Sequence, residues 1–141
     1  MKLTRASSYA LHAVAYMAQQ KTDLPVASHN IAHARKIPER FLLKVLKPLV
    51  SARVLQSIKG PNGGYKLARP AAGISILEII EAVDGAIQGQ PSWAEQHNPT
   101  LNNKIESICQ GSADVQRKFL EKQRLSDLVT AKPDGKKKSK D

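Results

Sequence analysis

A chain of 141 residues can form one compact domain with an accessory element and is too short for two full-sized domains. Of these residues 41% are hydrophobic and 4% aromatic, and the net charge is +10. The single cysteine excludes an intramolecular disulfide and fits a cytoplasmic protein, and no stretch approaches the roughly 20 apolar residues that a membrane span requires.

The positive charge is concentrated in the first half of the chain. Residues 1–70 carry twelve Lys or Arg and two acidic residues, whereas residues 71–141 carry ten of each. Between residues 71 and 131 there are five basic and eight acidic side chains. An excess so one-sided is typical of a surface that meets a polyanion, and it predicts a nucleic-acid partner for the first half.

Three helices are predicted in the first 52 residues. The first runs from Thr4, a good N-cap, to about Gln20. The second follows Ser28 and covers residues 29–36, and the third covers residues 38–52 with Pro38 as its first residue. The first helix buries a face with helical spacing: Ala6, Tyr9, Ala10, Ala13, Val14 and Met17.

The third predicted helix has two different faces. Its apolar stripe comprises Phe41, Leu42, Val45, Leu46, Leu49 and Val50. The opposite face comprises Arg40, Leu43, Lys44, Lys47 and Ser51, so basic side chains line one exposed edge. A helix fits the major groove of B-DNA and its N-terminal residues reach base edges, so Arg40 is a candidate for pairing with guanine, and Lys44 and Lys47 for binding phosphates.

A β-hairpin is predicted next, because two β-like runs, residues 54–58 and 65–67, flank the glycine-rich stretch GPNGG. After it, Ser75 and Glu78 form a capping box that begins a helix ending near Gly85. Residues 86–100 are expected to be irregular. A long helix over residues 101–124 then carries a coiled-coil-like seam that needs a partner surface: Leu101, Ile105, Ile108, Ser112, Val115 and Phe119.

Five segments are distinctive when taken together. They are MKLTRASSYAL at the start, IPERFLLKVLKPLV in the third helix, IKGPNGGYKLARP in the hairpin, ISILEIIEAVDG after it, and LSDLV near the end. In this combination the chain resembles the Rrf2 family of winged-helix transcription regulators over roughly residues 1–130. The resemblance implies a mainly α fold with a small β-hairpin, in which a winged helix-turn-helix is joined to a long C-terminal dimerisation helix.

The resemblance also implies a homodimer in which the long helix pairs with its mate. Each hairpin, or wing, and each third helix would then lie on one half of a palindromic double-stranded DNA operator. We expect residues 1–85 to form the DNA-binding domain, 86–131 the linker loop and dimerisation helix, and 132–141 a disordered basic tail. The expected DNA contacts are Arg5, Ser28, Pro38, Glu39, Arg40, Lys44, Lys47, Lys59, Gly60, Asn62, Gly63, Gly64 and Lys66.

The chain departs from the cluster-binding members of this family. Those members carry three closely spaced cysteines before the long helix, and the corresponding segment here, AIQGQPSWAEQHNPTLNN, contains none. Because an iron–sulfur cluster needs several thiolates, we expect no cluster and no other cofactor. Cys109 is either a redox-sensitive thiol or a small apolar residue beside the seam, and the second interpretation is favoured because free cysteines are commonly buried and inert.

No metal site is expected from the histidines and acids. Asp84, Glu95 and His97 match no strong ligand spacing. His29 and His33 are four residues apart, but a basic face near DNA disfavours a dication. Tyr9 has two equally supported interpretations, as a contact to the DNA backbone beside Arg5 or as a core residue.

The sequence therefore predicts a sequence-specific DNA-binding regulator, a repressor acting as a homodimer. An alternative is a protein-interaction module whose acidic second half binds a metabolic enzyme. The effector, whether protein or small molecule, is not defined by the sequence. An enzyme is disfavoured because no nucleophile–base pairing or phosphate-binding loop is recognisable.

Overall fold

Helix α1 (Arg5–Gln19) lies at the centre of the computed structural model, which describes residues 1–130. Thr4 caps the helix by accepting a hydrogen bond at Oγ1 from the Ser7 N–H, at 3.0 Å. The predicted start and face of this helix are confirmed, because Ala10, Ala13, Val14 and Met17 are buried. Ser7 is also buried, which the apolar pattern did not predict.

Helices α2 (Ser28–Arg35) and α3 (Glu39–Ser51) form the helix-turn-helix. The turn between them uses Lys36 in a left-handed conformation with φ of 54°. Both ends of each predicted helix were wrong by one residue: α2 begins at Ser28 and ends at Arg35, and α3 begins at Glu39 and ends at Ser51. Pro38 precedes α3 as its N-cap, with an extended ψ of 127°.

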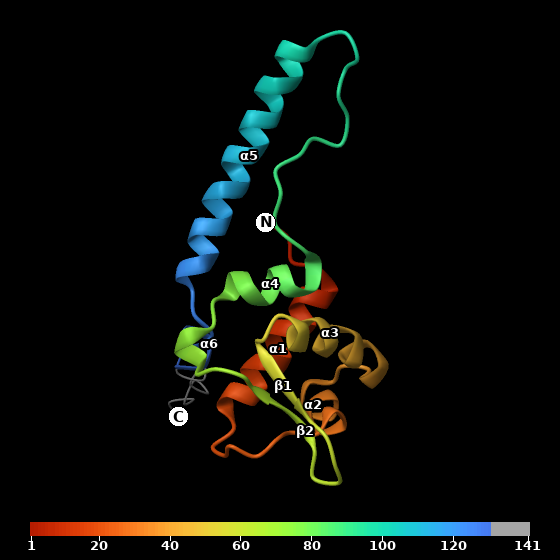
Figure 1. Ribbon diagram of the computed structural model, residues 1–141, viewed down its shortest axis with the longest axis vertical. Helices are drawn as coiled ribbons and strands as arrows, with labels where there is room; N and C mark the ends of the chain where they lie inside the picture. The colour runs from red at the N-terminus through yellow and green to blue at the C-terminus, as the bar shows by residue number, and fades with distance from the viewer. Residues whose placement is uncertain (131–141) are drawn as a thin grey trace, which may run out of the picture.

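Strands β1 (Leu55–Ile58) and β2 (Gly64–Leu67) form the predicted antiparallel hairpin, with Leu55 opposite Leu67 and Ile58 opposite Gly64. The hairpin projects from the lower end of the body (Figure 1). Val26 extends it by exchanging two backbone hydrogen bonds of 2.8 Å with Tyr65. Gly64 is required here, since a Cβ would lie 2.4 Å from the Val26 carbonyl oxygen and its φ is +155°.

The second half begins with a 3-10 turn, η1 (Ala71–Gly73), and α4 (Ile76–Asp84), whose predicted capping box is present. The chain then runs irregularly to α5 (Pro99–Lys122), which projects from the body as a long column (Figure 1). The predicted long helix is confirmed but ends two residues early. After it, α6 (Leu125–Thr130) returns to the body.

The core lies between α1, α3, α4 and the base of the hairpin. Its largest fully buried side chains are Ile31, Leu42, Leu46, Leu49, Leu55, Ile74, Ile79 and Leu125. Leu125 is the contribution of α6, so both ends of the described chain help to build one core. Across residues 1–130, none of the helices is long and apolar enough to cross a membrane. The expected disordered tail, residues 132–141, lies outside the described residues.

Candidate nucleic-acid interface

The face of α3 opposite the core is basic, as predicted. Leu42, Val45, Leu46 and Leu49 are buried, and Arg40, Lys44 and Lys47 are all exposed. Burial of the apolar stripe fixes the orientation of the helix, so its basic side chains emerge on the face that points away from the core.

Phe41 is not in the core, which corrects the predicted stripe. Its side chain is 39% exposed, at the edge between the two faces. The Arg40 guanidinium carbon lies 4.8 Å from the centre of the ring and the Lys44 Nζ 5.7 Å. Such cation–π contacts favour these positions, so Phe41 forms a platform under two cations of the basic face.

The first residues of α2 and α3 lie together. Ser28 donates a hydrogen bond from Oγ to Glu39 Oε1 at 3.2 Å, so the structure brings two predicted contact residues into one site. The exposed His29 and His33 lie further along α2. Arg35 is turned away, because its guanidinium lies 5.3 Å from the Tyr16 ring centre and bonds Gln19 Oε1 at 2.8 Å.

The loop of the wing carries Lys59, Gly60, Asn62 and Gly63, and the predicted Gly64 begins β2. Lys59 and Asn62 are exposed, and Gly60 has a φ of +111°. The Gly63 N–H closes the turn on the Gly60 carbonyl at 2.9 Å. A Cβ on Gly63 would lie 2.2 Å from the Ile58 carbonyl oxygen, so this tight reversal requires glycine.

Two further predicted basic residues lie outside the loop and outside α3. Lys66 is half-buried on β2, opposite Gln56. Arg5 is exposed at the start of α1, and Tyr9, one turn later, packs against the core. The core interpretation of Tyr9 is therefore the one that the structure supports.

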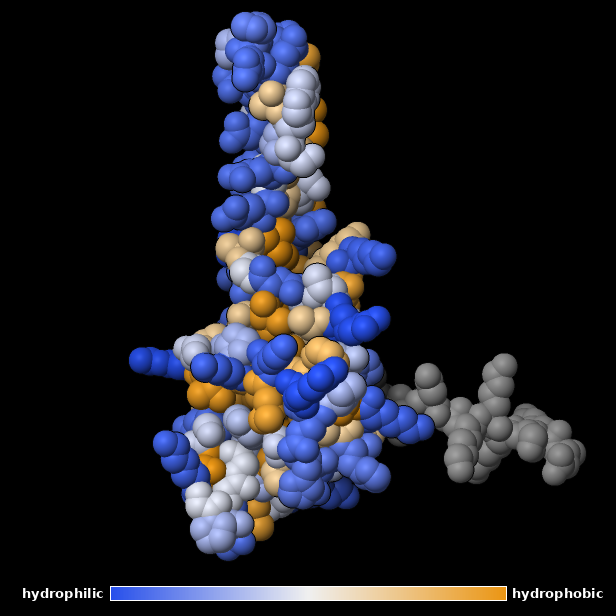
Figure 2. All heavy atoms as spheres, turned by 90° about the vertical axis from the view of Figure 1, so that its right-hand side faces the viewer, coloured by the Kyte–Doolittle hydropathy of each residue, from blue (hydrophilic) through white to orange (hydrophobic). Residues whose placement is uncertain are grey.

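These basic residues have no acidic partners within residues 1–130. The two ion pairs there join Arg69 to Glu78 and Arg117 to Glu81, so Arg5, Arg40, Lys44, Lys47, Lys59 and Lys66 are all unpaired in that range. Hydrophilic side chains project from the body on the side where α3 lies (Figure 2). The positive potential of this surface is therefore available to an external anion.

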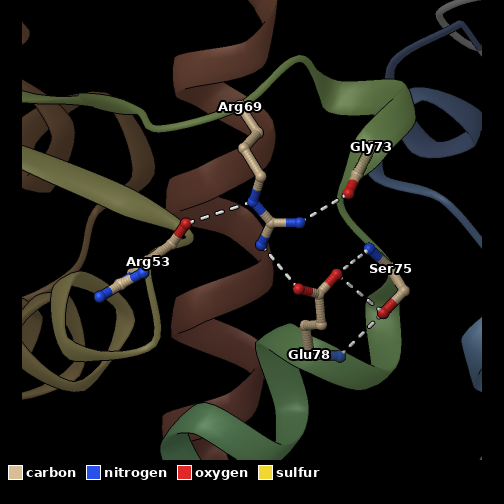
Figure 3. A network of polar contacts seen from close by, with 5 residues as sticks. All are labelled: Arg53, Arg69, Gly73, Ser75 and Glu78. Atoms are coloured by element: carbon tan, nitrogen blue, oxygen red, sulfur yellow. Dashed lines mark hydrogen bonds and ion pairs between the residues drawn. The ribbon is translucent and has the colours of Figure 1, made fainter.

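Arg69 is a basic residue with a structural role, which the sequence analysis missed. Its guanidinium donates to the carbonyls of Arg53 and Gly73 and to Glu78 Oε1, at 3.4, 2.8 and 2.6 Å (Figure 3). Glu78 Oε2 accepts from the Ser75 N–H at 2.8 Å. The end of the hairpin is thereby joined to the start of α4, so the wing has a fixed base.

The carboxylate of Glu78 is affected by this network. Partial burial raises its pKa, but the hydrogen bonds from Arg69 and from the Ser75 backbone together outweigh burial and lower the pKa below its ordinary value. The carboxylate that both caps α4 and holds Arg69 is thus kept ionised at neutral pH.

The seam of α5 is exposed along its length. Leu101, Ile105, Ser112 and Phe119 are exposed, and Ile108 and Val115 are 73% and 70% exposed. In Figure 2 hydrophobic side chains lie among hydrophilic ones along this column. Nothing in residues 1–130 covers the seam, in agreement with the prediction that it needs a partner surface.

Cys109 lies within α5 and is half-buried. Gly89, in the irregular segment, packs against it so closely that a Cβ would lie 2.0 Å from the Cys109 carbonyl oxygen. This segment is also attached by Glu81, which accepts from the Ile87 N–H at 2.7 Å and from Arg117 at 2.9 Å. The Arg117 hydrogen bond is the main cause that lowers the pKa of Glu81.

The acids considered as metal ligands have other partners. Asp84 accepts hydrogen bonds from Thr4 Oγ1 at 2.9 Å and from Ser7 Oγ at 2.5 Å. The backbone of Glu95, not its carboxylate, bonds the Asn102 side chain. Over the described part of the chain, no three His, Cys, Asp or Glu side chains gather as a metal site would require.

A family model described as "Iron-dependent Transcriptional regulator", Rrf2, matches residues 3–131. The chain belongs to the Rrf2 family. It is 29% identical over 135 residues to the HTH-type transcriptional regulator IscR of Cereibacter sphaeroides, covering 92% of this chain and 87% of IscR. It is also 33% identical over 87 residues to an HTH-type regulator of Mycobacterium tuberculosis, which covers 62% of this chain and 54% of that protein.

The fold agrees with solved members of the same group. CymR, the global cysteine regulator of B. subtilis, superposes with a TM-score of 0.74 at 24% identity, over 94% of this chain and 99% of CymR. This likeness confirms the winged helix-turn-helix with its long helix. The match to the mycobacterial regulator spans only about half of that protein's length.

The family description mentions iron, but the side chains of this chain do not provide the thiolate ligands of an iron–sulfur cluster. A cluster of the usual kind needs several thiolates, and the chain has one cysteine, placed inside α5. The segment before α5 offers no group of donors in its place within residues 1–130.

Proposed function

We propose that the protein is a sequence-specific, double-stranded DNA-binding repressor of transcription that acts as a homodimer on a palindromic operator. The observation that carries this proposal is the unpaired basic face of α3 beside a basic wing with a fixed base. Membership of a family of transcriptional regulators supports it.

In this proposal α3 enters the major groove. Arg40, in the first turn, binds the O6 and N7 of a guanine, and Lys44 and Lys47 bind phosphates at the edges of the groove. Ser28, Pro38 and Glu39 surround the start of α3, where backbone N–H groups suit a phosphate. The wing approaches the flanking backbone or the minor groove with Lys59, Gly60, Asn62, Gly63, Gly64 and Lys66, while Arg5 adds a phosphate contact from α1.

The proposed dimer forms through the seam of α5. The seam positions alternate at spacings of three and four residues, and all of them except Ser112 carry large apolar side chains that are exposed in the single chain. Two identical seams related by a twofold axis would cover each other. The same axis would place two α3 helices on two DNA half-sites, which is why the operator should be palindromic.

We further propose that the regulator works without an iron–sulfur cluster. The support is the donor set, one cysteine in α5 and no cysteine in the segment before it. Repression then requires only that the dimer occupies its operator. A signal must also release the dimer from its operator. The alternative function, binding of a metabolic enzyme through residues 71–131, which carry eight acidic and five basic side chains, would supply such a signal.

Selection of binding sites from a random duplex pool tests the function. The full chain should enrich a palindrome, and footprinting should protect two half-sites on one face of the DNA. Failure to enrich any sequence, together with capture of an enzyme from native lysate, would favour the protein-interaction alternative instead.

A further inference from the structure

Leu43 is an exposed apolar side chain within the basic face of α3. It is 43% exposed, and it belongs neither to the core nor to the half-buried side chains packed on the core. Arg40 and Lys47 lie three residues before it and four after it, on the same surface of the helix. A leucine can form a hydrogen bond with neither phosphate nor water, so a contact with an apolar group of a partner would be favourable at this position.

Phe41, the other exposed large apolar residue of α3, already contacts two side chains of its own helix. Arg40 and Lys44 both lie over its ring, at 4.8 and 5.7 Å. Leu43 has no comparable partner in α3 and is the apolar group of the basic face that remains to be covered.

The surroundings of Leu43 identify what could cover it. Three cations of α3 that have no acidic partner within residues 1–130 lie around it, so a partner that complements this surface carries negative charge and also presents an apolar group. Duplex DNA does both. In the major groove the bases present hydrogen-bond donors and acceptors, and the apolar group among the four standard bases is the C5-methyl of thymine.

We propose that Leu43 reads the C5-methyl group of a thymine in each half-site, an inference that rests on the proposed role of α3 in the major groove. Against any other base edge, leucine would remove water from a polar group without replacing its hydrogen bond. Side chains three apart on a helix have Cβ atoms about 5–6 Å apart, and base steps are about 3.4 Å. The thymine therefore lies one or two base steps from the guanine that Arg40 binds.

Deoxyuridine tests this directly, because it differs from thymidine only by the methyl group. Each thymine of a selected operator is replaced in turn and the Kd is measured by fluorescence anisotropy. One position per half-site should weaken binding about fourfold when replaced once, and about 15-fold when replaced in both half-sites. In a duplex with C·G at that position, 5-methylcytosine should bind more tightly than cytosine.

A variant assigns the effect to Leu43. Leu43→Ala should bind thymine and uracil operators alike, and the fold is expected to survive because the side chain is exposed. Leu128→Ala removes a similarly exposed leucine, at 47%, on α6 and should keep the full uracil penalty.

The outcomes separate this inference from the function on which it rests. If the protein binds its operator but no uracil substitution matters, the role of Leu43 is wrong and the DNA-binding function stands. A uracil penalty that persists in Leu43→Ala assigns the methyl contact to another side chain and also overturns the inference. If no duplex is bound, both proposals fail.

Discussion

Arg40 and Lys59 carry the same charge but are placed for different tasks. Arg40 is stacked over Phe41 on a helix whose other face is buried, whereas Lys59 lies in the loop of the hairpin next to Gly60. A guanidinium matches the two acceptors of guanine with its planar fork, and an ammonium is a point charge suited to phosphate. We therefore assign base discrimination to Arg40 and backbone affinity to Lys59.

Alanine substitutions distinguish these two roles. Arg40→Ala should relax discrimination at one base pair by about 1–3 kcal/mol, measured with operators changed at single positions. Lys59→Ala should weaken binding to all sequences, or to those with an A·T-rich minor groove, and reduce the salt slope of the dimer by about 2, one contact from each protomer. Lys104→Ala, on α5, serves as the charge control. Parental binding by both variants would show that the two assignments are wrong.

The ion pair between Glu81 and Arg117 makes the stability of the protein depend on acid pH. The pKa of Glu81 is lowered in the folded state from an ordinary value of 4.5. A lowered folded pKa stabilises the fold above the unfolded pKa, and this contribution is lost as the pH falls below about 4.5. Melting curves between pH 3 and 7 should show a shallower acid loss for Glu81→Gln than for the parent, and parallel curves would contradict this.

At the scale of elements, α5 has two sides with different partners. Ala113 and Leu120 are buried, the latter in the core cluster, and Cys109 faces the segment that contains Gly89. The seam that includes Ile108 and Val115 has no partner among residues 1–130. One side is thus fixed by this chain, and the other is left for the proposed second copy.

A charge on the seam should separate the proposed dimer. Val115→Glu should give a folded monomer by analytical ultracentrifugation and should weaken operator binding strongly. The side chain at position 115 is 70% exposed in the single chain, so a charge there costs the monomer little. In the dimer the same charge would be buried, which is costly. Asn103→Glu adds the same charge on the far side of the helix and should remain dimeric. A dimeric Val115→Glu protein would show that the seam is not the interface.

At the scale of the molecule, the charge is unevenly divided between the first half of the chain and the second. The first 70 residues hold twelve of the 22 basic residues and two of the twelve acids. The unpaired cations of α3 and of the wing belong to this half. An anionic partner should therefore be attracted to the first half, because residues 71–141, with ten basic and ten acidic side chains, carry no net charge.

Salt dependence measures this attraction. If the dimer neutralises about six to ten phosphates, log affinity should fall with log salt at a slope of about −5 to −9. Titrations of operator and nonspecific duplex between 50 and 300 mM salt would provide the slopes. A slope close to zero for the operator would contradict an interface built from these cations.

The sequence predicted the elements well because each has a local signal. Thr4, the Ser75–Glu78 capping box and the GPNGG loop specify their structures through neighbouring residues. Phe41 and Arg69 were not predicted correctly, because their positions depend on contacts made elsewhere in space. Phe41 fits an apolar stripe by spacing alone but lies outside the core, beneath two cations, and Arg69 joins the Arg53 carbonyl, 16 residues earlier in the chain, to Glu78.

The end of α5 was missed for the same reason. Arg124 could continue the helix, but its N–H bonds Asp127 at the start of α6. The candidate contacts in α3 and the wing could be predicted because their charge and their periodicity are visible in the sequence.

The return of the chain after α5 has a consequence for folding. The Ile76 N–H bonds the Gln123 carbonyl and the Leu125 N–H bonds the Ile74 carbonyl, both at 2.9 Å, and Leu125 is fully buried. A fragment cut at the proposed boundary near residue 85 would lack this side chain and expose the core beneath it. We therefore expect the proposed boundary to separate tasks and not folding units, so that the residues on its two sides unfold in a single cooperative transition in thermal melts.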